Sequence, residues 1–406
     1  MNRTSDKVLS LQSAGLQGLY WMALCPMYSF ASVYLLSKNF ANQQIGWVMA
    51  IGNILAVVLQ PTIGAFADRT KKFSLKTIIG SLVILTLVLL AGLIFFHVNW
   101  LGIAVFYCSI VALLLTLQPL VTSLIFEYIN AGHNLSFSAT RAVGSLAFAI
   151  LSSFLGIWVN RTSPNILPIV CVALVICFLF LTLAFPPLHE LKQARKTIVQ
   201  PAEQKGSLVS GGFLRKYERF IPFMIGIGCL FIFHTIINVY LVQIITPLGG
   251  KDSDLGISLT IAALCELPAF FGFSYLVSRF DTRTLLKAAG IFYVLRSLVF
   301  LFASSVWMVN LGQVIQGVTY ALYLPASVYY INQIMKDEDK VKGQTLITGA
   351  TTLGSVCGSI VGGWLLDRFN IQIMLIFGVA AAVGGCLFVI YSVSKKASPK
   401  TALVQP

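Results

Sequence analysis

Two ionisable residues of opposite charge lie within long apolar stretches of the sequence. Glu266 belongs to the run Cys265-Glu266-Leu267-Pro268, and Arg296 lies at a comparable depth in the next apolar stretch. Charged side chains are costly in an apolar surrounding, so those retained there are candidates for a function. A buried carboxyl group changes its proton affinity when a positive partner engages or leaves it. The pair therefore predicts reversible proton binding, with a static ion pair between two helices as the alternative.

Twelve apolar stretches, each long enough to cross a lipid bilayer, must position these residues. A transmembrane helix needs about 20 mainly apolar residues at a rise of about 1.5 Å per residue. Of the 406 residues, 57% are hydrophobic and only 10% are charged, unlike a soluble domain. The sequence thus predicts an all-helical membrane protein. The predicted spans are residues 15–36, 44–67, 75–96, 101–127, 139–159, 166–186, 220–245, 255–277, 284–303, 309–334, 344–366 and 371–393.

Positive charge is distributed unevenly between the two sides of these spans. Of the 28 Lys and Arg residues, those in loops after odd-numbered spans are only Lys38, Arg161, Lys251 and Arg368. The remaining Lys and Arg residues, apart from Arg296, lie in the two terminal segments or in and near the loops after even-numbered spans. Because segments rich in Lys and Arg stay in the cytoplasm, both termini are expected there. The cytoplasmic segments of a multi-pass protein, expected in a bacterial plasma membrane, thus account for the net charge of +14. Nucleic acid is not expected as a partner.

The two halves of the chain resemble each other. The segment that follows Pro61 is echoed after Pro268, and Gly156-Ile-Trp158 is echoed by Gly362-Gly-Trp364. Both echoes join one span to the span six places later. An even number of helices in each repeat gives two six-helix bundles of the same orientation, related by a pseudo-twofold axis along the membrane normal. The predicted domains are residues 1–188 and 220–406, with a polar cytoplasmic linker at 189–219.

The loop after the second span carries a recognisable motif. Its sequence, Gly64-Ala-Phe-Ala-Asp68-Arg69-Thr-Lys71-Lys72, resembles the signature loop Gly-x-Leu-x-Asp-Arg-x-Gly-Arg-Lys of the major facilitator superfamily. Lys71 stands where that family usually has Gly. With the six-plus-six arrangement, the resemblance covers nearly the whole chain. It implies the major facilitator fold and a gating role for Asp68 and Arg69, with an ordinary solvated loop as the alternative.

The stretch from Glu127 to Gly144 resembles the lactose-permease-like branch of that family, the oligosaccharide:proton symporters and related permeases. Arg141 falls on the sugar-binding Arg of that branch. The sugar-binding Glu falls near Ser123, one turn before Glu127, and the aromatic residue that stacks on the sugar falls near Phe148, where the branch has Trp. The resemblance implies that Arg141 and Phe148 bind the solute. Glu127 is either part of the proton-coupling group or an interfacial acid near Arg141.

Arg296 matches the Arg of the proton-coupling cluster of that branch, but the cluster is incomplete. Gln316 stands near the position of its His, and Thr319 stands near the position of its acid. Neither side chain carries a proton at ordinary pH. Glu266, about one turn from the Glu that the branch has in its eighth span, is the remaining buried carboxyl. Proton coupling is therefore expected at Glu266, or it is absent.

Neutral polar side chains share helical faces in several spans and predict a cavity. His234 and Asn238 are one turn apart, as are Gln316 and Tyr320, so each pair shares a face. Each residue taken alone is more often a packing residue. Together they describe a cavity for a neutral, hydroxyl-rich solute. The other predicted members are Tyr28, Asn53, Gln118 and Phe148.

These observations predict a secondary transporter that imports a small polar solute together with protons. A sugar, glycoside or nucleoside would bind near the midplane while the two halves rock around it. The alternative is a proton-coupled exporter of drugs or metabolites. Exporters of the superfamily have a Gly-Pro motif in the fifth span and often an acid in the first two spans, and this sequence has neither.

Other functional classes are disfavoured. A sensor on a transporter scaffold would tolerate loss of the buried charges, yet Glu266 and Arg296 are present. An enzyme is not expected, because no nucleophile with its base, no metal-ligand cluster and no phosphate loop is found in any span. We therefore expect no cofactor, and a monomer whose partners are the solute, protons and the lipid bilayer.

Overall fold

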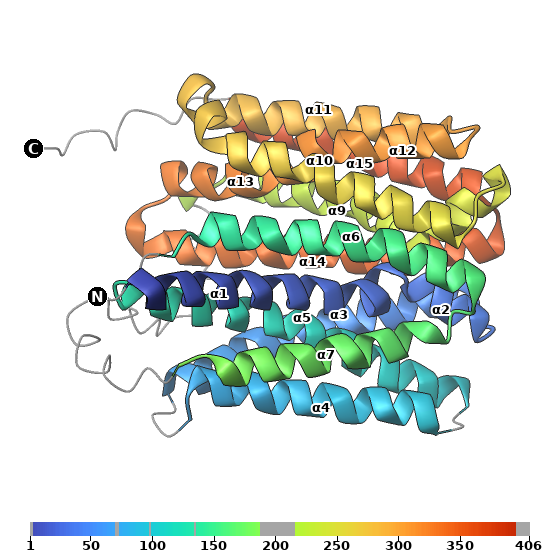
Figure 1. The fold of residues 1–406 in the computed structure, drawn as a ribbon. Coiled ribbons are helices and arrows are strands. Elements are labelled where there is room, and N and C mark those ends of the chain that lie inside the picture. Colours follow the sequence, from blue (N-terminus) through green and yellow to red (C-terminus); the bar gives the residue numbers. More distant parts are fainter. Residues whose placement is uncertain (1–2, 70–72, 97–98, 134, 187–215, 395–406) are drawn as a thin grey trace, which may run out of the picture.

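The computed structural model describes residues 3–69, 73–96, 99–133, 135–186 and 216–394. Its regular elements there are all helices, and they lie side by side in one bundle (Figure 1). Helix α1 begins and helix α15 ends at the same end of this bundle, which we call the terminal end. The opposite end is called the distal end.

The helices fall into two sets along the chain. The N-half contains α1 (Arg3–Leu24), the π-helical turn η1 (Cys25–Ser29), α2 (Ala31–Ser37), α3 (Asn42–Arg69), α4 (Leu75–Phe95), α5 (Trp100–Asn130), α6 (Phe137–Arg161) and α7 (Ile166–Ala184). The C-half contains α9 (Phe220–Ile245), the short η3 (Thr246–Leu248), α10 (Asp252–Arg279), α11 (Thr282–Leu301), α12 (Val306–Val314), η4 (Ile315–Val318), α13 (Tyr320–Ile334), α14 (Asp337–Arg368) and α15 (Ile371–Val393).

The predicted spans are found in this helix set. Ten helices of the described residues are each long and apolar enough to cross a membrane, and the bent segment from α1 to α2 supplies an eleventh. The remaining predicted span, residues 309–334, is divided into α12, η4 and α13. The prediction of an all-helical membrane protein is confirmed, with two of its spans interrupted.

A local feature accompanies each interruption. Pro26 lies in η1, where it has no N–H to donate to the preceding turn, and the helix axis bends by 43° at the end of η1, between Ser29 and Ala31. In η4, Gly317 packs so closely on the backbone carbonyl of Cys265 that a side chain would not fit. Irregular backbone is tolerated at membrane depth where protein covers it. The break in the tenth span turns Gln316 towards α10 and α11.

The two halves meet mainly along two pairs of helices, α3 with α14 and α6 with α10, and α2 also contacts α9. The two main pairs are the second and eleventh spans and the fifth and eighth spans. Moving every span by six places exchanges the two pairs, as the predicted pseudo-twofold axis requires. Small residues allow the helices to approach closely, since Gly46 lies against Ser359 and Gly256 lies against Ser152.

Hydrogen bonds between the halves, within the described ranges, all lie in the distal half of the bundle. The Thr260 hydroxyl on α10 lies 2.9 Å from that of Ser152 on α6. At the distal tips, Asp367 of α14 accepts hydrogen bonds from the first turn of α3. The distal end is therefore closed by direct contacts between the halves.

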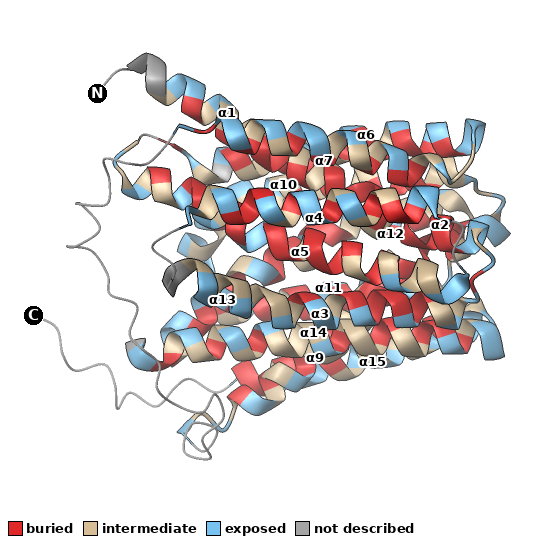
Figure 2. Ribbon diagram, turned by 90° about the horizontal axis from the view of Figure 1, so that it is seen from below, coloured by how far each residue is buried: buried red, intermediate tan, exposed pale blue. Residues whose placement is uncertain are grey.

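The outer surface of the bundle is apolar. Val88, Phe180 and Leu387 each leave more than half of their surface exposed. Figure 2 shows exposed positions along the outer sides of the helices and buried positions between them. An outer surface of this kind is suited to contact lipid chains.

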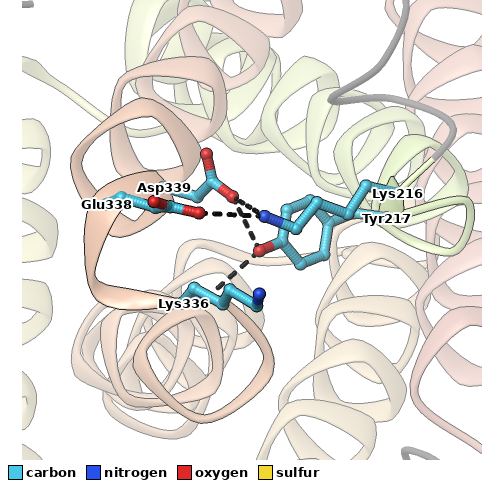
Figure 3. A network of polar contacts seen from close by, with 5 residues as sticks. All are labelled: Lys216, Tyr217, Lys336, Glu338 and Asp339. Carbon is cyan, nitrogen blue, oxygen red and sulfur yellow. Dashed lines mark hydrogen bonds and ion pairs between the residues drawn. The ribbon is translucent and has the colours of Figure 1, made fainter. Parts of the chain in front are cut away.

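The predicted linker, residues 189–219, lies outside the described residues up to position 215, so the domain boundaries stay a prediction. Where the described chain resumes, Lys216 Nζ lies 2.5 Å from Oδ2 of Asp339 in α14 (Figure 3). The Tyr217 hydroxyl donates to the same oxygen at 2.9 Å and accepts from the N–H of Lys336 at 3.2 Å. The beginning of the C-half is thus anchored to the beginning of α14, and the hydrogen bond to Asp339 raises the pKa of Lys216.

Candidate functional site

Glu266 and Arg296 are connected through a third side chain. Glu266 is buried near the middle of α10, where its Oε1 accepts a hydrogen bond from Nε2 of Gln316 at 2.7 Å. Oε1 of Gln316 accepts from Nη2 of Arg296 at 2.6 Å. An amide donates and accepts at once, so it links the two charges across η4. The residues that the sequence suggested as a direct ion pair are instead joined through Gln316.

Arg296 is fully buried in α11 and is held by several acceptors. Its Nε donates to the carbonyl of Gly312 at 3.0 Å, and Nη2 donates to Oε1 of Gln313 at 2.7 Å as well as to Gln316. Its Nη1 and the hydroxyl of nearby Tyr293 are buried and have no partner among the described residues. Buried polar atoms without a partner are costly, which suits them to a polar ligand.

His234 and Tyr320 form a parallel stack on the C-half. Their ring centroids are 4.9 Å apart and their planes differ by 10°. Tyr293 meets His234 edge-on at 6.4 Å, and Nδ1 of His234 is buried without a described partner. Asn238, predicted to share this face, donates its amide to the backbone carbonyl of His234 at 2.8 Å. Asn238 thus bonds within its own helix, whereas the ring of His234 belongs to the aromatic group around Tyr320.

Arg141 carries the positive charge on the N-half side. Its guanidinium carbon lies 4.1 Å from the ring centroid of Trp21 on α1, and its Nη1 donates to Ser145 at 2.8 Å. Glu266 on the C-half attracts Arg141 as well as Arg296 electrostatically. The described contacts of Arg141 do not include Glu127, which lies at the end of α5. The site therefore joins the two halves through Arg141 and Glu266.

Tyr28 and Asn53 lie next to this group. The Tyr28 hydroxyl, in η1, donates to Oδ1 of Asn53 at 3.5 Å, and Nδ2 of Asn53 donates to the carbonyl of Met49 at 2.7 Å. Tyr28 is close enough to Tyr320 to interact with it electrostatically across the two halves. These contacts place Tyr28 and Asn53 on the N-half side of the site.

Other predicted residues are placed less directly. Phe148 is partly buried on α6 and packs against the hydrophobic core. Gln118 is exposed on α5, and no hydrogen bond of its side chain is found within the described ranges. Asp68 and Arg69 end α3, but their side chains lie outside the described residues. In the part of the chain that the structure describes, no group of three or more His, Cys, Asp or Glu side chains could hold a metal ion.

A known protein family matches most of the chain. The model of the MFS_1 like family matches residues 15–377. The chain belongs to this family of the major facilitator superfamily. The protein is therefore a membrane transporter and not an enzyme, as the sequence predicted.

Similar proteins support the same assignment for the transporter. It is 26% identical over 377 residues to a maltose permease of Geobacillus stearothermophilus, covering 90% of each chain. It is 23% identical to the uncharacterized transporter YwbF of Bacillus subtilis, covering 91% of each chain.

Two solved structures share the fold of the transporter. The nucleoside transporter NupG has a TM-score of 0.81 at 15% identity, covering 96% of this chain and all of that one. A D-xylose-proton symporter has a TM-score of 0.69 at 14% identity, covering 94% of this chain and 97% of that one.

Two residues of the site are absent from the sequence-based prediction, Trp21 and Tyr293. The position of Trp21 offered a signal, because Trp residues of membrane helices concentrate at the lipid–water interfaces and this one stands well inside the first span. Tyr293 is three residues before Arg296, so the two share a helical face. In the transporter both residues lie beside a charged side chain.

Proposed function

We propose that the transporter imports a sugar, glycoside or nucleoside together with protons, by alternating access. The observation that carries this proposal is the position of Glu266. It lies midway along α10, bonded to Gln316, and is attracted by Arg296 of its own half and by Arg141 of the other half. A carboxylate that interacts with one cation in each half has a proton affinity that depends on how the halves are arranged.

Coupling follows from that dependence. When the halves bring Arg141 close to Glu266, the carboxylate is stabilised and the proton leaves. When a solute engages Arg141 or the halves separate, Glu266 loses part of that stabilisation and binds a proton. Solute and proton binding therefore favour each other, which is the requirement for symport.

The solute class is supported by the side chains around Glu266. The planar guanidinium of Arg141 presents parallel donors that suit neighbouring hydroxyl groups. Trp21 and Tyr320 add aromatic side chains beside these donors. One face of Trp21 packs on Arg141 and one face of Tyr320 stacks on His234, so the apolar face of a sugar ring, or a nucleobase, would contact the remaining surface of either ring. The names of the similar proteins refer to maltose, D-xylose and nucleosides, all of which carry such groups.

The closed distal end bears on the conformational state of the transporter. We propose that the terminal end is cytoplasmic, in agreement with the positive charge of its loops, and that the described state opens inwards. Thiol labelling tests this orientation. A Cys introduced at Lys72 should react with an impermeant maleimide in inside-out vesicles of a bacterial plasma membrane and not in intact cells.

Transport by purified protein in liposomes tests the function. Labelled maltose, D-xylose and uridine are each offered with the outside acidic, with the gradient collapsed by an ionophore, and with the inside acidic. We expect at least one solute to accumulate, and to do so only when the outside is acidic. Uptake that ignores the gradient contradicts coupling, acceleration by an acidic interior indicates antiport, and transport of none contradicts the solute class. Liposomes without protein are the control.

A further inference from the structure

Trp21 and Arg141 are 120 positions apart in the sequence, but α1 and α6 bring the guanidinium over the indole ring. The guanidinium carbon of Arg141 lies 4.1 Å from the centroid of the Trp21 ring, within the range of a cation–π contact. The rings of Tyr20 and Trp21 form a T-shaped pair, with their centroids 5.4 Å apart and their planes at 82°. The guanidinium thus lies over a ring that also packs against Tyr20.

The packing of α1 on α6 leaves a place for this ring. Gly144 is on the same helix as Arg141, and a Cβ at position 144 would lie 2.6 Å from Cδ1 of Trp21. Any side chain there would displace the ring. The absence of a Cβ at Gly144 therefore lets Trp21 reach Arg141.

The ring also carries a polar atom whose hydrogen-bonding capacity is unused within the described ranges. Nε1 of Trp21 is buried and has no hydrogen-bond partner among the described residues. Ser145 holds Nη1 of Arg141 at 2.8 Å, so the guanidinium is fixed by a hydrogen bond at one nitrogen and by the ring at its face. Side chains with this much support keep one geometry at little entropic cost on binding.

We propose that Trp21 is a positioning residue for Arg141. Its ring holds the guanidinium in the orientation in which the free donors face the solute, and its indole N–H supplies one further donor to a solute hydroxyl. The effect on solute binding rests on the proposed function, whereas the positioning of Arg141 does not. A residue that only filled space would leave the mobility and reactivity of Arg141 unchanged.

The first test follows the guanidinium itself. Purified full-length protein in detergent is treated with phenylglyoxal, which reacts with arginine, and the rate at Arg141 is read by mass spectrometry. We expect Trp21→Leu to raise this rate about tenfold or more and Trp21→Phe, which keeps an aromatic face, to stay within about threefold of the parent. Trp158→Leu removes an exposed aromatic side chain from the same helix as Arg141 and should change nothing.

Thermal unfolding identifies variants that fail to fold. If Trp21→Leu does not fold, Gly144→Ala replaces it, because the added methyl group displaces the ring without removing it. A folded Trp21→Leu or Gly144→Ala protein whose Arg141 reacts at the parental rate overturns the proposal.

The second test follows solute binding by counterflow of labelled maltose, D-xylose and uridine. For each probe that the parent transports, Trp21→Leu should raise the half-saturation concentration about tenfold to thirtyfold, as loss of a desolvated cation–π contact predicts. In an Arg141→Lys background, Trp21→Leu should raise the half-saturation concentration much less, because both residues act through one guanidinium. Fully additive losses overturn the positioning role. If the parent transports none of the three, the proposed function fails, and the phenylglyoxal rates still decide the role of Trp21.

Discussion

Asp367, at the end of α14, caps the first turn of α3 at Asn42, across the boundary between the halves. Its Oδ1 accepts from the N–H of Asn42 at 3.2 Å and from Nδ2 of Asn42 at 2.8 Å, and its Oδ2 accepts from the N–H of Gln43 at 2.7 Å. The first N–H groups of a helix lack partners within it, and its positive end attracts a carboxylate. This cap comes from the other half of the protein, so it exists only while the distal ends are together.

Asp367→Ala should therefore favour states in which the distal end is open. Loss of a helix cap costs about 1 to 2 kcal/mol, which is roughly a fivefold to thirtyfold change in population. The measurement is labelling of Asn53→Cys, in a background without other cysteines, by an impermeant maleimide added at the distal side. Asp254→Ala is the matched control, because Asp254 accepts the N–H of Lys251 within its own half. Equal labelling in both variants would show that the Asp367 cap does not hold the halves together.

Glu266→Gln should separate exchange from net transport. The amide resembles the protonated carboxyl group, so the solute can still bind and cross the membrane. Release of the proton is no longer possible. Uptake driven by a pH gradient should be lost while counterflow of labelled for unlabelled solute is retained. Gradient-driven uptake equal to that of the parent would assign Glu266 a structural role and direct attention to Glu127.

Gln316→Leu should break the link between the charges of Glu266 and Arg296. Each loses a buried hydrogen bond, so the free energy of unfolding should fall by about 1 to 3 kcal/mol and gradient-driven uptake should fall strongly. Gln313→Leu is the control, because Gln313 bonds to Arg296 but lies outside the link to Glu266. Thermal unfolding and uptake are compared in parallel. Similar losses of uptake in the two variants would contradict a role for the link in coupling.

Arg141→Lys should weaken solute binding by more than tenfold while the protein stays folded. Lys keeps the charge but has no planar fork and cannot stack on Trp21 as a guanidinium does. Half-saturation in counterflow gives the affinity. Arg161→Lys, in the last turn of the same helix, controls for a general effect of the substitution. An unchanged affinity would leave Arg141 a structural role only.

Asp339→Asn should destabilise the terminal end of the C-half more than Glu338→Gln. Both acids contact Lys216, but the side chain of Asp339 is 10% exposed and also accepts from Tyr217, whereas Glu338 is 71% exposed. We expect a loss of about 1 to 3 kcal/mol for Asp339 and less than about 1 kcal/mol for Glu338. Because the contact raises the pKa of Lys216, the lysine remains charged and the difference should be unchanged between pH 6 and pH 9. Equal melting temperatures for the two variants would contradict this ranking.

The hydropathy of the sequence predicted the spans because transmembrane helices satisfy their backbone locally. Length and apolar composition are then sufficient, and all twelve predicted stretches coincide with helical segments. The symmetry was likewise visible in the repeats, and the pairs α3 with α14 and α6 with α10 agree with it. Glu266 and Arg296 could be selected singly because a charge in an apolar stretch is evident without any contact information. Arg141 was selected through its resemblance to the sugar-binding Arg of the lactose-permease-like branch.

What connects these residues was decided by tertiary structure. The sequence marked Gln316 as a departure from a familiar cluster and as a residue of the predicted cavity. Its bridging position between Glu266 and Arg296 depends on the break at η4 and on the fit of Gly317 against Cys265. The contact of Trp21 with Arg141 depends on how closely α1 approaches α6 at Gly144, and the cap of Asp367 on α3 depends on the closure of the distal end. Hydrophobicity and helical period are properties of neighbouring residues, so the sequence determined which segments cross the membrane and which charges lie within them. Contacts between side chains far apart in the chain depend on helix breaks and interhelical distances, which only the folded packing sets.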